Sequence, residues 1–134
     1  MAKELPRGIR NKNPLNIRIG NTWLGEVKEP TDDQFEQFIS MAYGCRAAFV
    51  ILRRYIRRYK RDTIRKIVSS WAPASENNVS TYVNDVVKRT GLGPDQAIHY
   101  SDQKTMCALV MAMAIHENGQ PISADDVLKG YKMA

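Results

Sequence analysis

The sequence contains no run of about 18 consecutive apolar residues, which is roughly the length that a helix needs to cross a bilayer. We therefore predict a protein without membrane insertion. The first ten residues, MAKELPRGIR, also lack the apolar core of a secretory signal peptide. With no export signal of this kind, we expect the chain to be cytoplasmic as made.

Cysteine and histidine are scarce. Cys45 and Cys107 both lie within apolar helical patterns, so we predict buried thiols in a reducing compartment rather than a disulfide. His99 and His116 are too few for a metal cluster of familiar spacing, and we predict no metal and no other cofactor. The sequence also lacks a GxSxG elbow and a P-loop, which argues against serine hydrolases and nucleotide-binding enzymes of those types.

The most apolar stretch is TMCALVMAMAI, residues 105–115. It is apolar on nearly every side of a helical wheel, whereas a surface helix keeps one polar face. We therefore predict a central helix that the other helices surround. Asn118 and Gly119, with Pro121 just beyond, predict where this helix ends.

Other segments repeat apolar residues at spacings of three and four, which is typical of amphipathic helices. These segments are residues 41–59, 64–71, 79–87 and the part of the chain after Ser123. Residues 1–30 show no helical period but many turn formers, which predicts an ordered, irregular segment, and residues 21–27 predict a short strand or the edge of a β-hairpin. The 134 residues thus predict one compact, mainly α domain of five or six helices.

The net charge of +6 is concentrated in one segment. Residues 46–66 contain nine Lys and Arg and a single acid, Asp62, whereas the other 113 residues carry eleven basic and thirteen acidic side chains. The helical pattern places most of these arginines on the outer side of the helix predicted at residues 41–59. Such a surface suits nucleic acid, an anionic cell-envelope polymer, or water alone.

Three sets of polar residues are candidates for a site. The loop at residues 7–18 carries Arg10, Asn11, Asn13 and Asn16, which suit sugar hydroxyls, N-acetyl groups or carboxylates, although Asn also serves as a turn former. The second set is Trp71, Glu76, Asn77 and Tyr82, an aromatic surface beside a carboxylate and an amide.

Glu76 would act as a general acid in a cleft of low dielectric constant, or would instead satisfy backbone amides at a helix N-terminus. The third candidate is Glu117, which follows the central helix pattern. A carboxylate at a helix C-terminus opposes the helix dipole, so its position needs a reason. Either it pairs with an arginine of the loop, or it is kept partly protonated for chemistry.

A series of motifs runs through residues 7–92 in order: RGIRNxNPxNIR at 7–18, WxG at 23–25, FxxF at 35–38 and WAPxxEN at 71–77. This series resembles the small lysozyme-like proteins of phages, prophages and mobile elements, which are often described as virion or structural proteins. The resemblance implies a compact lysozyme-like fold and cleavage of peptidoglycan glycan strands, by hydrolysis or transglycosylation.

The resemblance also implies roles for the candidate residues. Glu117 or Glu76 would be the general acid, Trp71 and Tyr82 would flank the sugar, and the other polar candidates would position it. Two departures from the family pattern matter: Leu15 replaces a usual Gly, and Glu117 is not followed by the Gly-Leu-Met-Gln stretch of transglycosylases.

Two alternatives belong to other functional classes. One is a non-catalytic structural or binding protein of a phage with the same fold. The other is a nucleic-acid-binding protein that uses Arg53, Arg54, Arg57, Arg58 and Arg61. A muralytic protein without a signal peptide would be associated with the virion or released to the cell wall.

Overall fold

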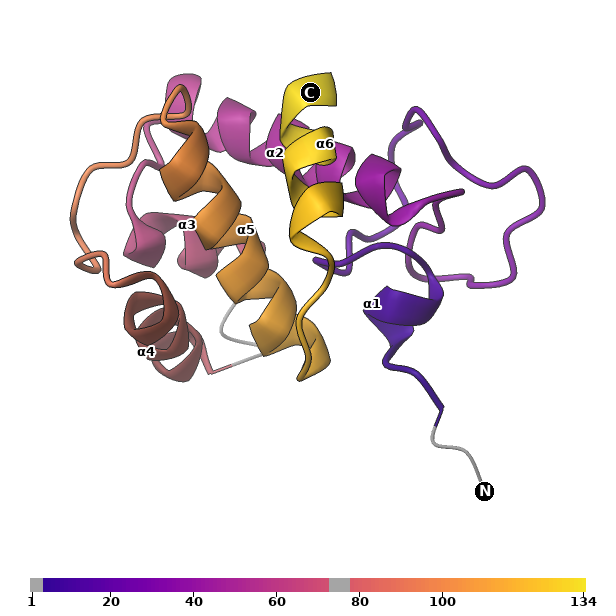
Figure 1. Cartoon of the computed structure of the whole chain (residues 1–134), viewed down its shortest axis with the longest axis horizontal. Helices are drawn as coiled ribbons and strands as arrows, with labels where there is room; N and C mark the ends of the chain where they lie inside the picture. The colour runs from indigo at the N-terminus through magenta and orange to yellow at the C-terminus, as the bar shows by residue number, and fades with distance from the viewer. Residues whose placement is uncertain (1–3, 73–77) are drawn as a thin grey trace.

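The computed structural model describes residues 4–72 and 78–134 of the chain, and this part is mainly helical, as the sequence predicted (Figure 1). Its six helices are α1 (Arg7–Arg10), α2 (Met41–Arg57), α3 (Ile64–Trp71), α4 (Val79–Thr90), α5 (Gln103–Asn118) and α6 (Ala124–Met133). Within these residues, no helix is long and apolar enough to span a membrane.

Helix α5 is the central helix that the apolar stretch predicted. It contacts α1, α2, α4 and α6, and it lies between α4 and α6 in Figure 1. Met106, Leu109 and Met113 are fully buried along its length. Because neighbours cover α5 on several sides, its sequence needs no polar face.

Capping contacts set most of the helix ends. Helices α2 to α6 each begin at a residue whose side-chain oxygen accepts a hydrogen bond from a backbone N–H in the first turn; these caps are, in chain order, Ser40, Thr63, Asn78, Asp102 and Ser123. Helices α4 and α5 end at Gly91 and Gly119, whose φ angles of 75° and 73° lie in the left-handed region.

Helix α6 packs closely against α2. Gly130 makes this possible, because a Cβ atom there would overlap Cβ of Cys45 and the backbone nitrogen of Arg46. The rings of Phe49 and Tyr131 meet edge to face at 5.2 Å beside this contact. Cys45 is buried under α6, Cys107 is half-buried, and both are free thiols.

The N-terminal segment before α2 is ordered and mostly irregular, and it packs beside the helices in Figure 1. The sequence did not predict α1, because a four-residue helix is too short to show a period. The predicted strand or hairpin edge at residues 21–27 is reduced to single bridges. Glu26 pairs with Phe38 and Arg18 with Phe35, both antiparallel. Gly25, at a φ of 83°, turns the chain beside the first of these bridges.

Two carboxyl groups lie together in this segment. Glu36 is 6% exposed, and burial together with the negative charge of Glu26 raises the pKa of Glu36 to about 7. The folded protein therefore binds the proton of Glu36 more tightly than the unfolded chain does. It follows that this group makes folding less favourable as the pH rises from 4.5, its ordinary pKa, towards 7.

We expect Glu36→Gln to raise the melting temperature at pH 8 by about 3 °C and to leave it nearly unchanged at pH 4.5. The neutral amide keeps the size of the side chain and removes the repulsion from Glu26. Thermal unfolding followed by circular dichroism between pH 4.5 and 8 measures both effects. Glu29→Gln removes one exposed carboxylate and is the matched control. An equal gain at both pH values would contradict the prediction.

Candidate functional site

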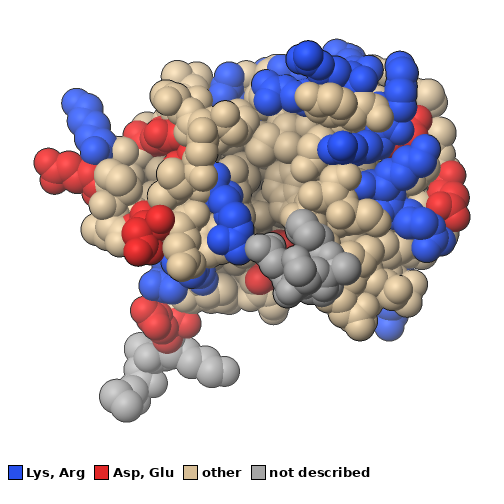
Figure 2. Space-filling model, turned by 180° about the vertical axis from the view of Figure 1, so that it is seen from behind, with Lys and Arg blue, Asp and Glu red and all other residues tan. Residues whose placement is uncertain are grey.

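A cleft of about 480 Å³ lies between the N-terminal segment and the helices. Its walls combine one acid, one amide and several aromatic and apolar side chains; the lining residues are Leu15, Asn16, Ile17, Arg18, Phe35, Ile51, Tyr55, Ser70, Trp71, Ala72 and Glu117. Figure 2 shows a hollow on one face of the molecule with Lys and Arg side chains around it. The volume is within the usual range for small-ligand sites, roughly 300–1,000 Å³.

Glu117 enters the cleft from the last turn of α5. Its side chain is half-buried, and Asn16 Nδ2 donates a hydrogen bond of 3.0 Å to its Oε1 atom. The sequence suggested an arginine of the loop as one partner, whereas this contact comes from a loop amide. An amide fixes one carboxylate oxygen without adding a full positive charge.

Asn16 reaches Glu117 because the loop is bent into a strained shape. Its φ angle of 52° is in the left-handed region, which Asn tolerates better than most residues. Asn13 stabilises this bend from the buried side. Its Oδ1 atom accepts from the backbone N–H of Ile17, and its Nδ2 atom donates to the backbone oxygens of Ile17 and Glu36. Asn13 therefore shapes the loop from inside and presents no group to the cleft.

Asn118, next to Glu117, joins α5 to the same loop. Its Nδ2 atom donates to the backbone oxygens of Ala114 in α5 and Pro14 in the loop, both at 2.9 Å. Gly8 of α1 packs directly against its Oδ1 atom, where a Cβ would overlap. Sequence reasoning interpreted Asn118 only as a helix stop, and the one available signal was its place beside Glu117.

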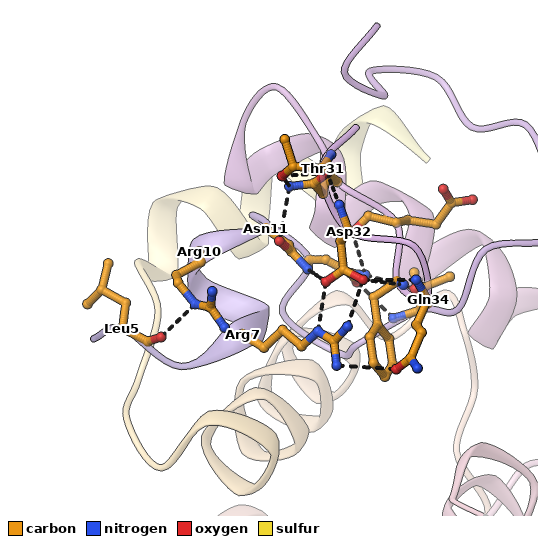
Figure 3. A network of polar contacts seen from close by, with 12 residues as sticks. Leu5, Arg7, Arg10, Asn11, Thr31, Asp32 and Gln34 are labelled. Carbon is orange, nitrogen blue, oxygen red and sulfur yellow. Dashed lines mark hydrogen bonds and ion pairs between the residues drawn. The ribbon is translucent and has the colours of Figure 1, made fainter. Parts of the chain in front are cut away.

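The Phe35 wall of the cleft is fixed by a polar network around Asp32 (Figure 3). Arg7 binds both oxygens of Asp32 at 2.7 Å, and Asn11 Nδ2 donates to the same carboxylate at 2.9 Å. Asp32 also accepts the backbone N–H groups of Gln34 and Phe35. The Arg7 guanidinium is the main reason that the pKa of Asp32 lies far below its usual range.

The aromatic side of the cleft comes from three separate segments. Trp71, at the end of α3, donates its Nε1–H to the backbone oxygen of Leu15 at 2.9 Å, which fixes the indole against the loop. Tyr55 of α2 meets Trp71 edge to face, with centroids 6.1 Å apart. The Phe35 ring lies against the guanidinium groups of Arg7 and Arg18, at 4.4 and 4.8 Å.

Behind Glu117, Tyr82 of α4 is completely buried, with its ring 4.0 Å from that of His116. Burial, reinforced by the negative charges of Glu117 and Asp85, raises the pKa of Tyr82 well above its ordinary value. The phenol therefore stays neutral. His116 is fixed in turn, because its Nδ1 atom lies 2.8 Å from Asp85 Oδ2.

The structure places some of the candidate site residues in the cleft and others away from it. Glu117, Asn16 and Trp71 meet in the cleft. Tyr82 lies behind it, and Asn11 and Asn13 are buried in the network of the N-terminal segment. Arg10 points elsewhere, to the backbone oxygen of Leu5 and the carboxylate of Glu4. Glu76 and Asn77 lie outside the described residues.

Sequence reasoning did not single out Phe35, Ile51 and Tyr55 as parts of a site. All three occur in apolar patterns that also describe a protein core, so the sequence offers no signal that they face a cleft. In the part of the chain that the structure describes, no cluster of three or more His, Cys, Asp or Glu side chains could hold a metal ion.

Replacing Asn16 separates its backbone role from its side-chain role. We expect Asn16→Ala to lower the free energy of unfolding by about 1 kcal/mol more than Asn16→Gly, because only glycine accepts the left-handed backbone without strain. Urea unfolding of the three proteins measures the difference. Equal losses in the two variants would contradict the left-handed geometry.

Comparison with known proteins places the chain in a family. No protein-family model matches it. It is 37% identical over 134 residues to "Protein P5" of Pseudoalteromonas phage PM2, an alignment that covers 96% of this chain and 82% of the phage protein. The match extends over nearly the whole chain, including the loop, α3 and α5, which build the cleft. The chain therefore belongs to the same family as Protein P5 of phage PM2.

Proposed function

We propose that this protein cleaves the glycan strands of peptidoglycan, as a hydrolase or a lytic transglycosylase, with Glu117 as the general acid. The observation that carries the proposal is the position of Glu117 in the cleft. A half-buried carboxylate at the end of the central helix is fixed by Asn16 and faces a wall that contains Trp71 and Tyr55. An aromatic wall opposite a carboxylate and an amide suits a sugar ring, which has apolar faces and polar edges.

The contacts of Glu117 suit proton donation. Asn16 holds Oε1, which leaves Oε2 to carry the proton to the glycosidic oxygen. The buried, neutral Tyr82 behind the carboxylate excludes water from that side. Both features fix one orientation of the acid before substrate arrives, and orientation of this kind contributes strongly to rate.

The remaining step depends on which group attacks the sugar. Among the described residues that line the cleft, Glu117 is the one carboxylate. In hydrolysis a water molecule attacks the anomeric carbon, whereas in transglycosylation a hydroxyl of the same sugar attacks it and Glu117 takes up the proton that it loses. A second carboxylate at the spacing of hydrolytic pairs would favour hydrolysis.

Family membership supports a phage setting for this activity. The relative with 37% identity is a phage protein, which agrees with a place in the virion or a release to the cell wall. The same observation favours the second candidate function, a non-catalytic structural or binding protein of the virion that keeps the fold. One fold supports both, so activity on the wall decides between them.

We expect Glu117→Gln to reduce the release of soluble fragments from purified peptidoglycan by at least about 100-fold, because the amide cannot donate the proton. The glutamine keeps an oxygen for Asn16, so the variant should unfold at nearly the wild-type temperature. Turbidity loss and chromatography of the fragments measure activity. The fragment ends distinguish hydrolysis, which leaves reducing sugars, from transglycosylation, which leaves anhydro sugars.

Glu76→Gln is the matched variant, and we expect it to retain activity within about tenfold of wild type. If Glu76→Gln loses most of its activity and Glu117→Gln retains it, then Glu76 and not Glu117 is the general acid. A well-folded wild type that releases nothing at any pH between about 4 and 8 would favour the structural function instead.

A further inference from the structure

Five arginines, three exposed and two half-buried, form a surface along α2 and the turn after it, which we call the arginine face: Arg53, Arg54, Arg57, Arg58 and Arg61. They supply most of the positive charge of residues 46–66, while the rest of the chain is slightly acidic. Figure 2 shows Lys and Arg side chains gathered on one side of the hollow. The proposed chemistry at Glu117 makes no use of this charge.

The arginine face lacks an acidic counterpart among the residues that the structure describes. Within residues 4–72 and 78–134, none of the five forms an ion pair with a carboxylate. Other basic side chains nearby do, such as Arg65 with Asp95 and Lys66 with Asp62. Guanidinium groups this close repel one another, and a polyanion bound across them would relieve that repulsion.

Tyrosine rings contact four of these arginines instead. Arg53 and Arg57 lie over the ring of Tyr100, at 5.4 and 5.1 Å from its centroid. Arg58 and Arg61 lie over the ring of Tyr59, at 5.7 and 5.0 Å. A guanidinium that rests on a ring face keeps N–H groups at its edge free for an anion, and it loses less conformational freedom on binding one.

The arginine face continues into the cleft. Arg61 also lies over Tyr55, at 5.3 Å, and Tyr55 packs against Trp71 in the cleft wall. Arg58, the C-cap residue of α2, follows the lining residue Ile51 by seven positions, which places both on the same side of the helix. One long ligand could therefore occupy the cleft and lie along the arginines.

We propose that the arginine face binds the carboxylates of the same polymer whose sugar enters the cleft, so that the substrate is an anionic glycan and not a neutral one. This inference rests on the proposed function, because it takes the cleft as the sugar site. Peptidoglycan fits it, since peptides that end in carboxylates branch from its glycan strand. Arginine suits carboxylates because its planar fork matches their two oxygens. Each exposed contact is weak, but several along one polymer add together.

Binding is measured with the Glu117→Gln protein, which does not consume its ligand. The triple variant Arg54→Gln, Arg57→Gln, Arg58→Gln is compared with a control triple, Lys88→Gln, Lys104→Gln, Lys132→Gln, whose three exposed lysines lie on other helices. Both triples remove three positive charges. The ligands are intact peptidoglycan sacculi, sacculi whose carboxylates have been converted to neutral methylamides, and chitin, a neutral glycan.

At low salt we expect the arginine triple to bind intact sacculi about tenfold more weakly than the control triple does. On amidated sacculi, and likewise on chitin, the two triple variants should bind with the same affinity as each other. Raising the salt to about 0.5 M should remove the difference on intact sacculi, because exposed charges are then screened. An equal loss in both triples, or a difference that persists on amidated sacculi, would overturn the inference.

A single-stranded DNA oligonucleotide tests the other polyanion. If it binds through the same arginines and displaces the protein from sacculi, the face serves nucleic acid and the inference is overturned. Different results would contradict the proposed function and this inference. A wild type that binds sacculi through the arginines without cleaving them contradicts catalysis alone, whereas cleavage with arginine-independent binding contradicts this inference alone.

Discussion

The side-chain amide of Asn118 is the contact on which the cleft depends. Its hydrogen bond to the backbone oxygen of Pro14 ties the end of α5 to the N-terminal loop, its second bond holds the amide to Ala114 within α5, and both are buried. A buried donor left without a partner costs about 1–3 kcal/mol, so the loop cannot leave this position cheaply. Because Glu117 precedes Asn118 and Asn16 lies two residues after Pro14, this one amide sets the spacing between Glu117 and Asn16.

The N-terminal segment achieves its order with polar groups where the rest of the protein uses apolar ones. Asn13 is completely buried and satisfies three backbone groups, and Asp32 collects Arg7, Asn11 and two backbone amides. Such networks fix a single geometry when they are complete. This explains how a segment with one four-residue helix and two isolated bridges forms a rigid wall.

Local patterns in the sequence predicted most of the helices, because periodicity and capping are properties of short segments. The central position of α5 followed from its lack of a polar face, and its end at Gly119 followed from the stop residues after the apolar stretch. Glu117 was recognised because a carboxylate at a helix C-terminus opposes the dipole, and Trp71 because it offers an aromatic surface beside polar residues. The resemblance to lysozyme-like proteins stays an inference from motifs and is a part of the proposal that the muralytic assay tests.

The roles within the asparagine loop could not be separated by sequence. Three asparagines lie within one six-residue stretch, at positions 11, 13 and 16, and the sequence does not distinguish them. The structure shows that Asn11 binds Asp32, that Asn13 binds buried backbone groups and that Asn16 reaches Glu117. Tyr82 is a second example, since an amphipathic pattern does not indicate whether its ring lines a cleft or lies in the core behind it.

The cleft is also built from parts of the chain that are made at very different times. Asn16 and Glu117 are 101 residues apart, and Pro14 and Asn118 are 104 apart. Bringing such distant segments together costs loop entropy that nearby helical contacts do not. A growing chain would therefore emerge from the ribosome with the loop, α2, α3 and α4 already made and no cleft to use. The cleft is complete only when α5 has been made and has met the loop, so unfinished chains lack it.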